Sequence, residues 1–187
     1  MRAMRTPSTL IAAAAILVAA AAAGETERPP FPAIQLHDLS GQAVDLKDVL
    51  GSATVVNFWA TWCGPCRLEL PELQKLYNDV GGKGLVLLAV DVDLPPSPED
   101  EGVGPQLEVA KPRIDALLKR LGITLPVYVV DGKTQMELGL QNIPFTVLLD
   151  SKGRVVRLYP GYSAAGVADL RKTVLEVLAE HSGKGGK

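Results

Sequence analysis

The most constraining feature of this sequence is an apolar segment that leads directly into two closely spaced cysteines. Residues 53–60 (ATVVNFWA) are rich in β-branched and aromatic side chains and contain few polar ones, which is typical of a strand buried on both faces of a sheet. Cys63 and Cys66 follow, and leucines then recur at helical spacing until Gly81. The chain must therefore hold a CxxC motif between a central strand and a helix.

The rest of the chain predicts further strands and helices around that central strand. Alternating polar and apolar residues at 34–46 indicate a small hairpin that turns at 40–42. Further strands are expected at 85–92, 126–130, 145–149 and 155–159, with a hairpin turn at 150–153 between the last two. Helices are expected at 106–120, with a break or a late start at Pro112, and at 164–179. This order is typical of an α/β fold, a mixed central sheet with helices on both faces.

The N-terminus has the composition of an export signal. Arg2 and Arg5 precede an almost unbroken apolar run at 10–23 that ends in small residues. Such a pattern is typical of a signal peptide, here residues 1–23. The alternative is an uncleaved membrane anchor, although the run is shorter than the ~20 apolar residues that span a bilayer. We therefore expect an exported, periplasmic protein in a compartment where disulfides persist.

Length and composition indicate one domain between short flanking segments. The chain has 187 residues, 47% of them hydrophobic, which is enough for a single core. We expect a Pro-rich linker at 24–32, the domain at 33–180 and a flexible tail at 181–187. A Pro- and acid-rich stretch at 95–105 is expected to be a loop within the domain. The formal net charge of −2 provides no basic excess for a nucleic-acid partner.

Two thiols at the start of a helix favour thiol–disulfide exchange. The attacking species is the thiolate, and an ordinary cysteine is only a few per cent ionised at neutral pH. The unpaired N–H groups and the positive dipole end of a helix N-terminus stabilise this anion by up to ~2 kcal/mol. We expect Cys63 to be the exposed attacker and Cys66 the less exposed resolving thiol. Gly64 lets a partner backbone approach closely, and Pro65 suits the first helical turn.

Other uses of the two cysteines are less well supported by the sequence. A zinc or iron–sulfur site needs about four donors, whereas the chain adds only the isolated His37 and His181 to its two cysteines. Attachment of a c-type haem needs a histidine where Arg67 stands. We therefore expect no metal and no cofactor. A purely structural disulfide remains an alternative, although so short a loop adds only ~2 kcal/mol on the chain-entropy model.

Residues 55–71 (VVNFWATWCGPCRLELP) resemble the active-site stretch of the thioredoxin superfamily. The ELP ending and the export signal are similar to those of the extracytoplasmic TlpA/ResA branch. Over residues 34–179, the order of the predicted strands and helices is also similar to that of this family. The resemblance implies a three-layer thioredoxin-like fold with an N-terminal hairpin and a redox-active Cys63–Cys66 disulfide. It also implies that the partners are client protein thiols and disulfides, for example in apocytochrome c, and a membrane electron donor.

The resemblance extends to individual residues outside the motif. Ile143 and Pro144 are similar to the family's cis-proline loop, which faces the disulfide and pairs with the client backbone. Phe145 departs from the Thr commonly found at its position, which puts the client preference in doubt. Trp62, beside Cys63, is similar to the aromatic flank that contacts the client.

The position of Asn57 departs from the pattern of many thioredoxins, which carry there a buried Asp that handles the proton of the resolving cysteine. Asn cannot titrate. In the TlpA/ResA branch this role is attributed to a Glu at the position of Glu69, three residues past Cys66 and on a similar helix face. If buried, this carboxylate has a raised pKa and serves as a general base. The alternative is a solvated helix glutamate without a role.

The leading functional hypothesis is a reductant of client disulfides, with Cys63, Cys66 and Glu69 as catalytic residues. The Gly-Pro spacer adds no charge that stabilises the reduced thiolate, which favours a thioredoxin-like potential. A dithiol oxidase or isomerase uses the same residues in the reverse direction. A third hypothesis is a thioredoxin-fold binding module without turnover. The residues expected to contact the client are Trp62, Gly64, Pro65, Ile143 and Pro144.

Overall fold

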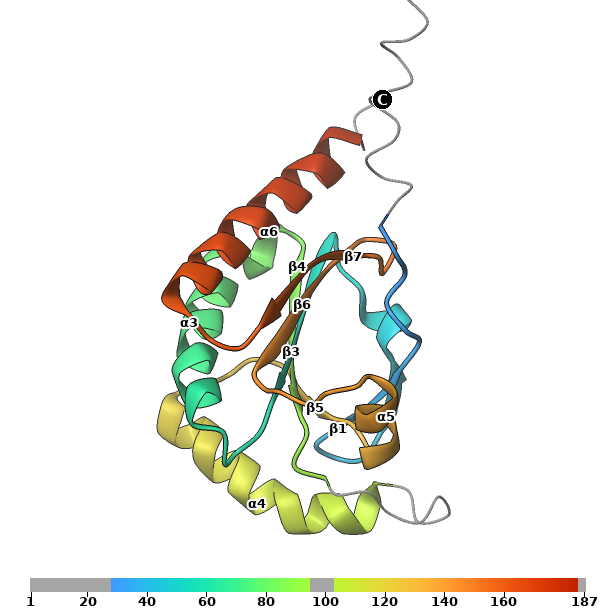
Figure 1. Ribbon diagram of the computed structural model, residues 1–187, viewed down its shortest axis with the longest axis vertical. Coiled ribbons are helices and arrows are strands. Elements are labelled where there is room, and N and C mark those ends of the chain that lie inside the picture. The colour runs from blue at the N-terminus through green and yellow to red at the C-terminus, as the bar shows by residue number, and fades with distance from the viewer. Residues whose placement is uncertain (1–27, 95–102, 185–187) are drawn as a thin grey trace, which may run out of the picture.

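The computed structural model describes residues 28–94 and 103–184, which form a seven-stranded mixed sheet flanked by helices (Figure 1). The strands are β1 (Gln35–Asp38), β2 (Ala43–Asp45), β3 (Ala53–Trp59), β4 (Leu85–Asp91), β5 (Val127–Val129), β6 (Phe145–Asp150) and β7 (Val155–Pro160). Their spatial order is β2-β1-β5-β4-β3-β6-β7. β3 pairs in parallel with β4 and antiparallel with β6, so it lies inside the sheet, as predicted.

Helices cover both faces of the sheet. The long helices α3 (Gly64–Val80), α4 (Gly104–Leu121) and α6 (Ala164–Lys184) pack on one face. The short helix α5 (Gly132–Glu137) lies on the opposite side of the sheet, with the β1–β2 hairpin and the 3-10 helix Leu46–Val49 (Figure 1). A second 3-10 helix, Gly81–Lys83, follows α3. This arrangement confirms the predicted mixed sheet with helices on both faces.

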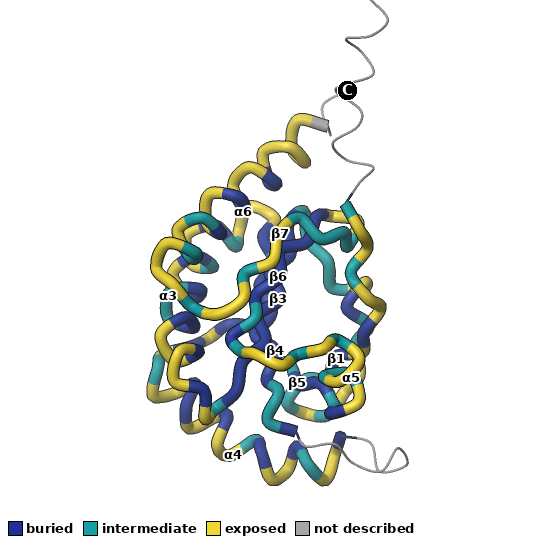
Figure 2. The backbone as a smooth tube through the Cα atoms, in the orientation of Figure 1, coloured by how far each residue is buried: buried dark blue, intermediate teal, exposed yellow. Residues whose placement is uncertain are grey.

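β3 fixes the position from which the chain leaves the sheet toward the cysteines. All seven of its residues are buried, and the strand is dark blue in Figure 2. Val55 and Trp59 pack toward the three long helices, whereas Val56 and Phe58 pack into the core of the opposite face. Because successive side chains of a strand point to opposite faces, a strand covered on both sides must be apolar throughout.

The predicted helix break at Pro112 is wrong. α4 runs without interruption from Gly104 to Leu121, with Pro112 inside it. Ile114 and Leu117 are buried along the face that packs on the core. The burial of this face stabilises the helix enough to tolerate the one backbone hydrogen bond that an interior proline removes.

Two further helical segments differ from the sequence prediction. α6 continues past residue 179 into the first residues of the expected tail, where the Ser182 hydroxyl donates to the Leu178 carbonyl (3.0 Å). α5 has no counterpart among the predicted elements. It begins after Asp131, whose carboxylate accepts a hydrogen bond from the Thr134 N–H (2.6 Å). With six residues, α5 is too short for a helical pattern to be recognised.

Part of the segment expected to be a linker packs onto the domain. The Phe31 N–H donates to the Gly153 carbonyl (3.0 Å), and the Val155 N–H donates to the Pro29 carbonyl (2.8 Å). The predicted signal peptide at 1–23 and most of the predicted loop at 95–105 lie outside the described residues. Within residues 28–94 and 103–184, no helix has the length and apolar character of a membrane span.

Candidate active site

The two cysteines form a disulfide at the N-terminus of α3. β3 ends at Trp59, and in the turn that follows the Cys63 N–H donates to the Ala60 carbonyl (3.2 Å). Cys63 is the extended N-cap residue of α3, and a proline lies in the first helical turn. The Cα atoms of Cys63 and Cys66 are 5.3 Å apart. The central strand and the helix therefore present the motif at the end of the sheet.

The start of α3 favours an anion on the Cys63 sulfur. The Cys66 N–H donates to Cys63 Sγ (3.2 Å), and the first turn of α3 contains no acidic residue. The Ile143 carbonyl oxygen lies 3.7 Å from the same sulfur. After reduction, a thiolate at Cys63 keeps the Cys66 N–H donor and is stabilised by the helix dipole. Cys63 is therefore the better placed of the two sulfurs to attack a disulfide.

Cys63 is less exposed than the sequence predicts. It keeps 4% of its surface and Cys66 keeps none, so their order is as predicted but the expectation of an exposed attacker is wrong. The cause is the segment with the cis Ile143–Pro144 peptide bond, which places the Ile143 carbonyl against Cys63 Sγ. A Cβ atom at Gly64 meets no atom within 4 Å, so the surface beside the sulfur is open on that side.

The residues expected to contact a client border the disulfide. Trp62 is 70% exposed, whereas Trp59 is fully buried and belongs to the core. Gly64 and Pro65 are exposed at the start of α3. An exposed tryptophan next to a reactive sulfur is a candidate contact for a partner.

Glu69 is buried and hydrogen-bonded, which contradicts the solvated alternative. It is 3% exposed, and its carboxylate accepts hydrogen bonds from Asn57 Nδ2 (2.8 Å) and Thr146 Oγ1 (3.2 Å). Asn57 Nδ2 also donates to Thr146 Oγ1 (2.8 Å). Asn57 and Thr146 face each other across β3 and β6. Glu69 therefore links α3 to two central strands, about one helical turn beyond Cys66.

Burial makes Glu69 titrate near neutral pH. Loss of water contact raises the pKa of Glu69 from 4.5 to about 7, against the lowering effect of the hydrogen bonds from Asn57 and Thr146. Both protonation states are therefore populated at neutral pH. Such a carboxyl has the proton affinity that a general base needs in this pH range.

The turn before Cys63 is held from two sides through Thr61. The Asp93 carboxylate accepts hydrogen bonds from the Thr61 N–H (3.2 Å) and from its hydroxyl. The Arg67 guanidinium donates to the Thr61 carbonyl through Nε (3.1 Å) and Nη2 (2.6 Å). Because Asp93 follows β4 and Arg67 lies on α3, these contacts fix the turn between the sheet and the helix.

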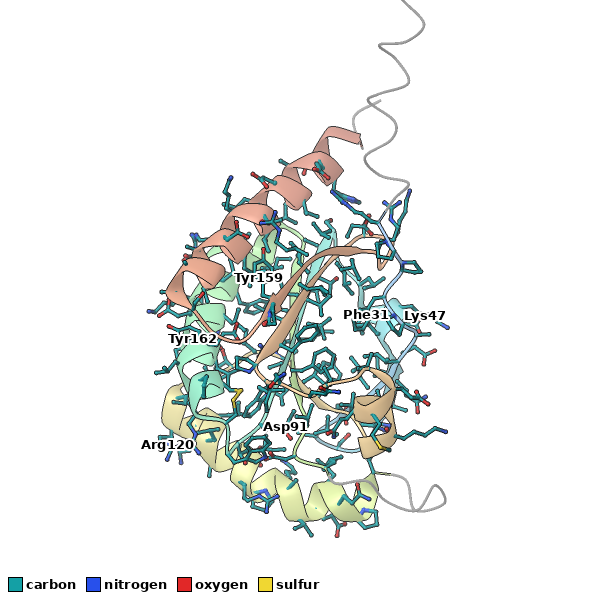
Figure 3. All side chains as sticks on the ribbon, in the orientation of Figure 1. Phe31, Lys47, Asp91, Arg120, Tyr159 and Tyr162 are labelled. Atoms are coloured by element: carbon teal, nitrogen blue, oxygen red, sulfur yellow. A yellow bond between two sulfur atoms is a disulfide. The ribbon has the colours of Figure 1, made fainter. Side chains whose placement is uncertain are left out.

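Asp91, at the end of β4, is fully buried on the side of α4 (Figure 3). Its Oδ1 accepts the Asp93 N–H (2.8 Å), while its Oδ2 has no partner among the described residues. Burial, and secondarily the charge of Asp93, raises the pKa of Asp91 to about 8. Asp91 is therefore mostly protonated at neutral pH.

The model of the AhpC/TSA family matches residues 28–175. The chain belongs to the AhpC/TSA family. This family member is 31% identical over 166 residues to the thiol-disulfide oxidoreductase ResA of Geobacillus thermodenitrificans, a match that covers 84% of this chain and 86% of that protein. It is 28% identical over 127 residues to the ResA of Halalkalibacterium halodurans. That second match covers 67% of this chain and 64% of the length of the relative.

A solved structure shows the same fold for this AhpC/TSA family member. The putative thiol:disulfide interchange protein DsbE from Chlorobium tepidum aligns with a TM-score of 0.66 and 25% identity, over 81% of this chain and 96% of the other. Together with the ResA relatives, this likeness confirms the predicted thioredoxin-like fold and the class of thiol-disulfide oxidoreductases.

Two contacts of this family member were not predicted from its sequence. Thr146 joins the Glu69 network from β6, and its pairing with Asn57 follows from the register of β3 and β6, which needs the tertiary fold. Asp93 holds Thr61 across 32 positions of the chain, and no sequence motif marks that contact.

Proposed function

We propose that this chain reduces disulfides in client proteins outside the cytoplasm. The observation that carries the proposal is the Cys63–Cys66 pair at the N-terminus of α3, with the Cys66 N–H 3.2 Å from Cys63 Sγ. The relatives named thiol-disulfide oxidoreductase support the chemistry. The signal-like composition of residues 1–23 supports a periplasmic location. In this proposal the segment is either cleaved off after export or kept as a membrane anchor.

The reduced protein transfers two electrons in two exchange steps. In the first, the Cys63 thiolate attacks one sulfur of the client disulfide, and the other client sulfur leaves as a thiolate and takes up a proton. In the second, Glu69 takes the proton of the Cys66 thiol, directly or through one water, and the Cys66 thiolate attacks Cys63 Sγ. The mixed disulfide breaks and releases the second client thiolate. The Cys63–Cys66 disulfide is the product of this cycle.

The client is proposed to bind across the residues that border Cys63. The Ile143 carbonyl lies 3.7 Å from Cys63 Sγ, so the backbone of this segment is placed to pair with a client segment that approaches the sulfur. Trp62, Gly64 and Pro65, which are exposed beside Cys63 in the sequence, are proposed to contact the same client segment. From the resemblance we propose apocytochrome c as one client and a membrane protein as the donor that regenerates the dithiol.

The redox midpoint of the Cys63–Cys66 pair tests the direction of the proposed reaction. No charged residue lies between the cysteines, so we expect a midpoint nearer to the ~−270 mV of thioredoxin than to the ~−120 mV of a strong oxidant. Equilibration of the protein with glutathione buffers, followed by alkylation of the free thiols, measures it. A midpoint near the oxidant value would instead assign this chain the role of a dithiol oxidase.

A further inference from the structure

A groove lined by three arginines lies beside the redox-active cysteines. It is a hollow of about 330 Å³ between the turn before Cys63, the start of α3 and the second half of α4. Arg67, Arg113 and Arg120 line it together with Trp62. Figure 3 shows Arg120 on α4, next to the end of α3 at which that helix begins. Among the described residues, no carboxylate side chain lines this groove.

The spacing of residues on α4 builds one wall of the groove. Arg113, Ala116, Leu117 and Arg120 follow at positions i, i+3, i+4 and i+7 and therefore share one face of the helix. Leu117 is 4% exposed and holds this face against the core. The two arginines are exposed and separated by two helical turns, a rise of about 10 Å. The small side chain of Ala116 leaves space between them.

Two carboxylates lie near the groove, Asp91 at the end of β4 and Asp93 just after it, and neither forms an ion pair with an arginine of the groove among the described residues. Neither Arg113 nor Arg120 makes an ion pair in the part of the chain that the structure describes. Asp93 uses its oxygens to hold Thr61. Asp91 is buried and mostly protonated at neutral pH because its pKa is raised to about 8. Arg113 acts through its charge on the buried Asp91, but the guanidinium groups of Arg113 and Arg120 are exposed and form no ion pair among the described residues. They are therefore available to a carboxylate of a partner.

We propose that this groove binds an acidic segment of the client polypeptide close to the disulfide that is reduced. The inference rests on the proposed function and adds a preference among clients. Guanidinium groups pair with carboxylates in a forked geometry, and Trp62 offers an apolar surface for the same segment. The whole chain carries a formal net charge of −2, which by itself disfavours an acidic partner. A preference for acidic clients must therefore arise locally, from the groove.

A set of matched peptides tests this preference without requiring turnover. Three cysteine-free peptides of equal length carry Glu, Gln or Lys at the same flanking positions around a central serine. Their affinities for the oxidised protein are measured by titration calorimetry at low and at high ionic strength. We expect the Glu peptide to bind about fivefold more tightly than the Lys peptide at low salt, and the difference to shrink at high salt.

Variants of α4 assign the preference to the groove. The double variant Arg113→Gln/Arg120→Gln is expected to lose the difference between the Glu and Lys peptides. Lys119→Gln removes the same kind of charge from a neighbouring exposed position that does not line the groove, and it is expected to keep the difference. Reduction rates of the corresponding disulfide peptides report on the proposed function separately.

Three results overturn the inference. The first is that the wild type binds all three peptides equally. The second is that the double variant keeps the full preference for the Glu peptide. The third is that the arginines bind vesicles of anionic phospholipid while the protein does not distinguish the peptides. A wild type that prefers the Glu peptide but reduces no disulfide supports the groove and refutes the proposed function.

Discussion

Replacement of Cys66 by Ser is expected to convert the protein into a trap that holds its clients as mixed disulfides on Cys63. Without the second thiol, the bond between Cys63 and the client has no internal nucleophile to release it. Steady-state reduction of clients is expected to fall by at least about a thousandfold, because the two sulfurs act as a unit. Non-reducing electrophoresis followed by mass spectrometry measures the trapped species and identifies the client.

The reciprocal variant, Cys63→Ser, is the matched control for the trap. It keeps the resolving thiol, which is fully buried, and is expected to capture no client and to show no turnover. Capture by Cys63→Ser at the level of Cys66→Ser would contradict the assigned roles of the two sulfurs. Unchanged non-covalent binding by Cys63→Ser, together with no trapping by Cys66→Ser, would favour the binding-module alternative.

Replacement of Glu69 by Gln is expected to slow the release of the mixed disulfide by about a hundredfold, within the range for loss of a general base. The pKa of Glu69 is raised to about 7, so the resolving rate of the wild type is expected to increase as the pH rises through about 7. The variant is expected to lose this inflection. Stopped-flow kinetics of the second step between pH 5 and 9 measure both effects.

The same variant tests the raised pKa of Glu69 independently of turnover. The pKa of Glu69 is higher in the folded protein than its ordinary value of 4.5, so the folded state keeps a proton that the unfolded state has lost. The free energy of unfolding of the wild type therefore falls as the pH rises from about 4.5 to about 7, by on the order of 3 kcal/mol from this group. Glu69→Gln is expected to lack this contribution, which urea unfolding of the oxidised proteins at the two ends of the range detects.

A matched control for Glu69 lies on the same helix. Glu72 is more exposed and pairs with Lys75 at the surface (2.8 Å), so Glu72→Gln is expected to change neither the pH profile nor the rate. If Glu69→Gln kept the inflection near pH 7 and the wild-type rate, Glu69 would not be the proton acceptor of Cys66.

The parts of the fold that the sequence predicts are those in which local pattern and burial agree. The continuous apolar run of β3 predicts burial on both faces. The leucines after Cys66 predict α3, and Gly81 predicts its end. α5 was missed because its signal is the single N-cap Asp131. The break at Pro112 was wrongly predicted because the local cost of a proline does not include the tertiary burial of Ile114 on the same helix.

In the candidate site too, some residues could be predicted from the sequence and others could not. The cysteines are recognised from the short CxxC motif, whereas the segment at Pro144 was expected only from the family resemblance. The environment of Glu69 depends on side chains from β3 and β6 that meet only in the folded chain. The sequence therefore left open whether Glu69 is a buried proton acceptor or a solvated helix residue. The reduced exposure of Cys63 has the same origin, because the carbonyl that covers it lies 80 positions away.

The ionisation of Cys63 tests the central claim most directly. In Cys66→Ser, the rate of alkylation by iodoacetamide is followed from pH 4 to 10, so that only one thiol reports. We expect the midpoint of reactivity at least about one pH unit below the ordinary cysteine value of about 8.5, because the N-terminus of α3 stabilises the thiolate. A midpoint at or above that ordinary value, or a thiol that does not react at any pH, would contradict the account.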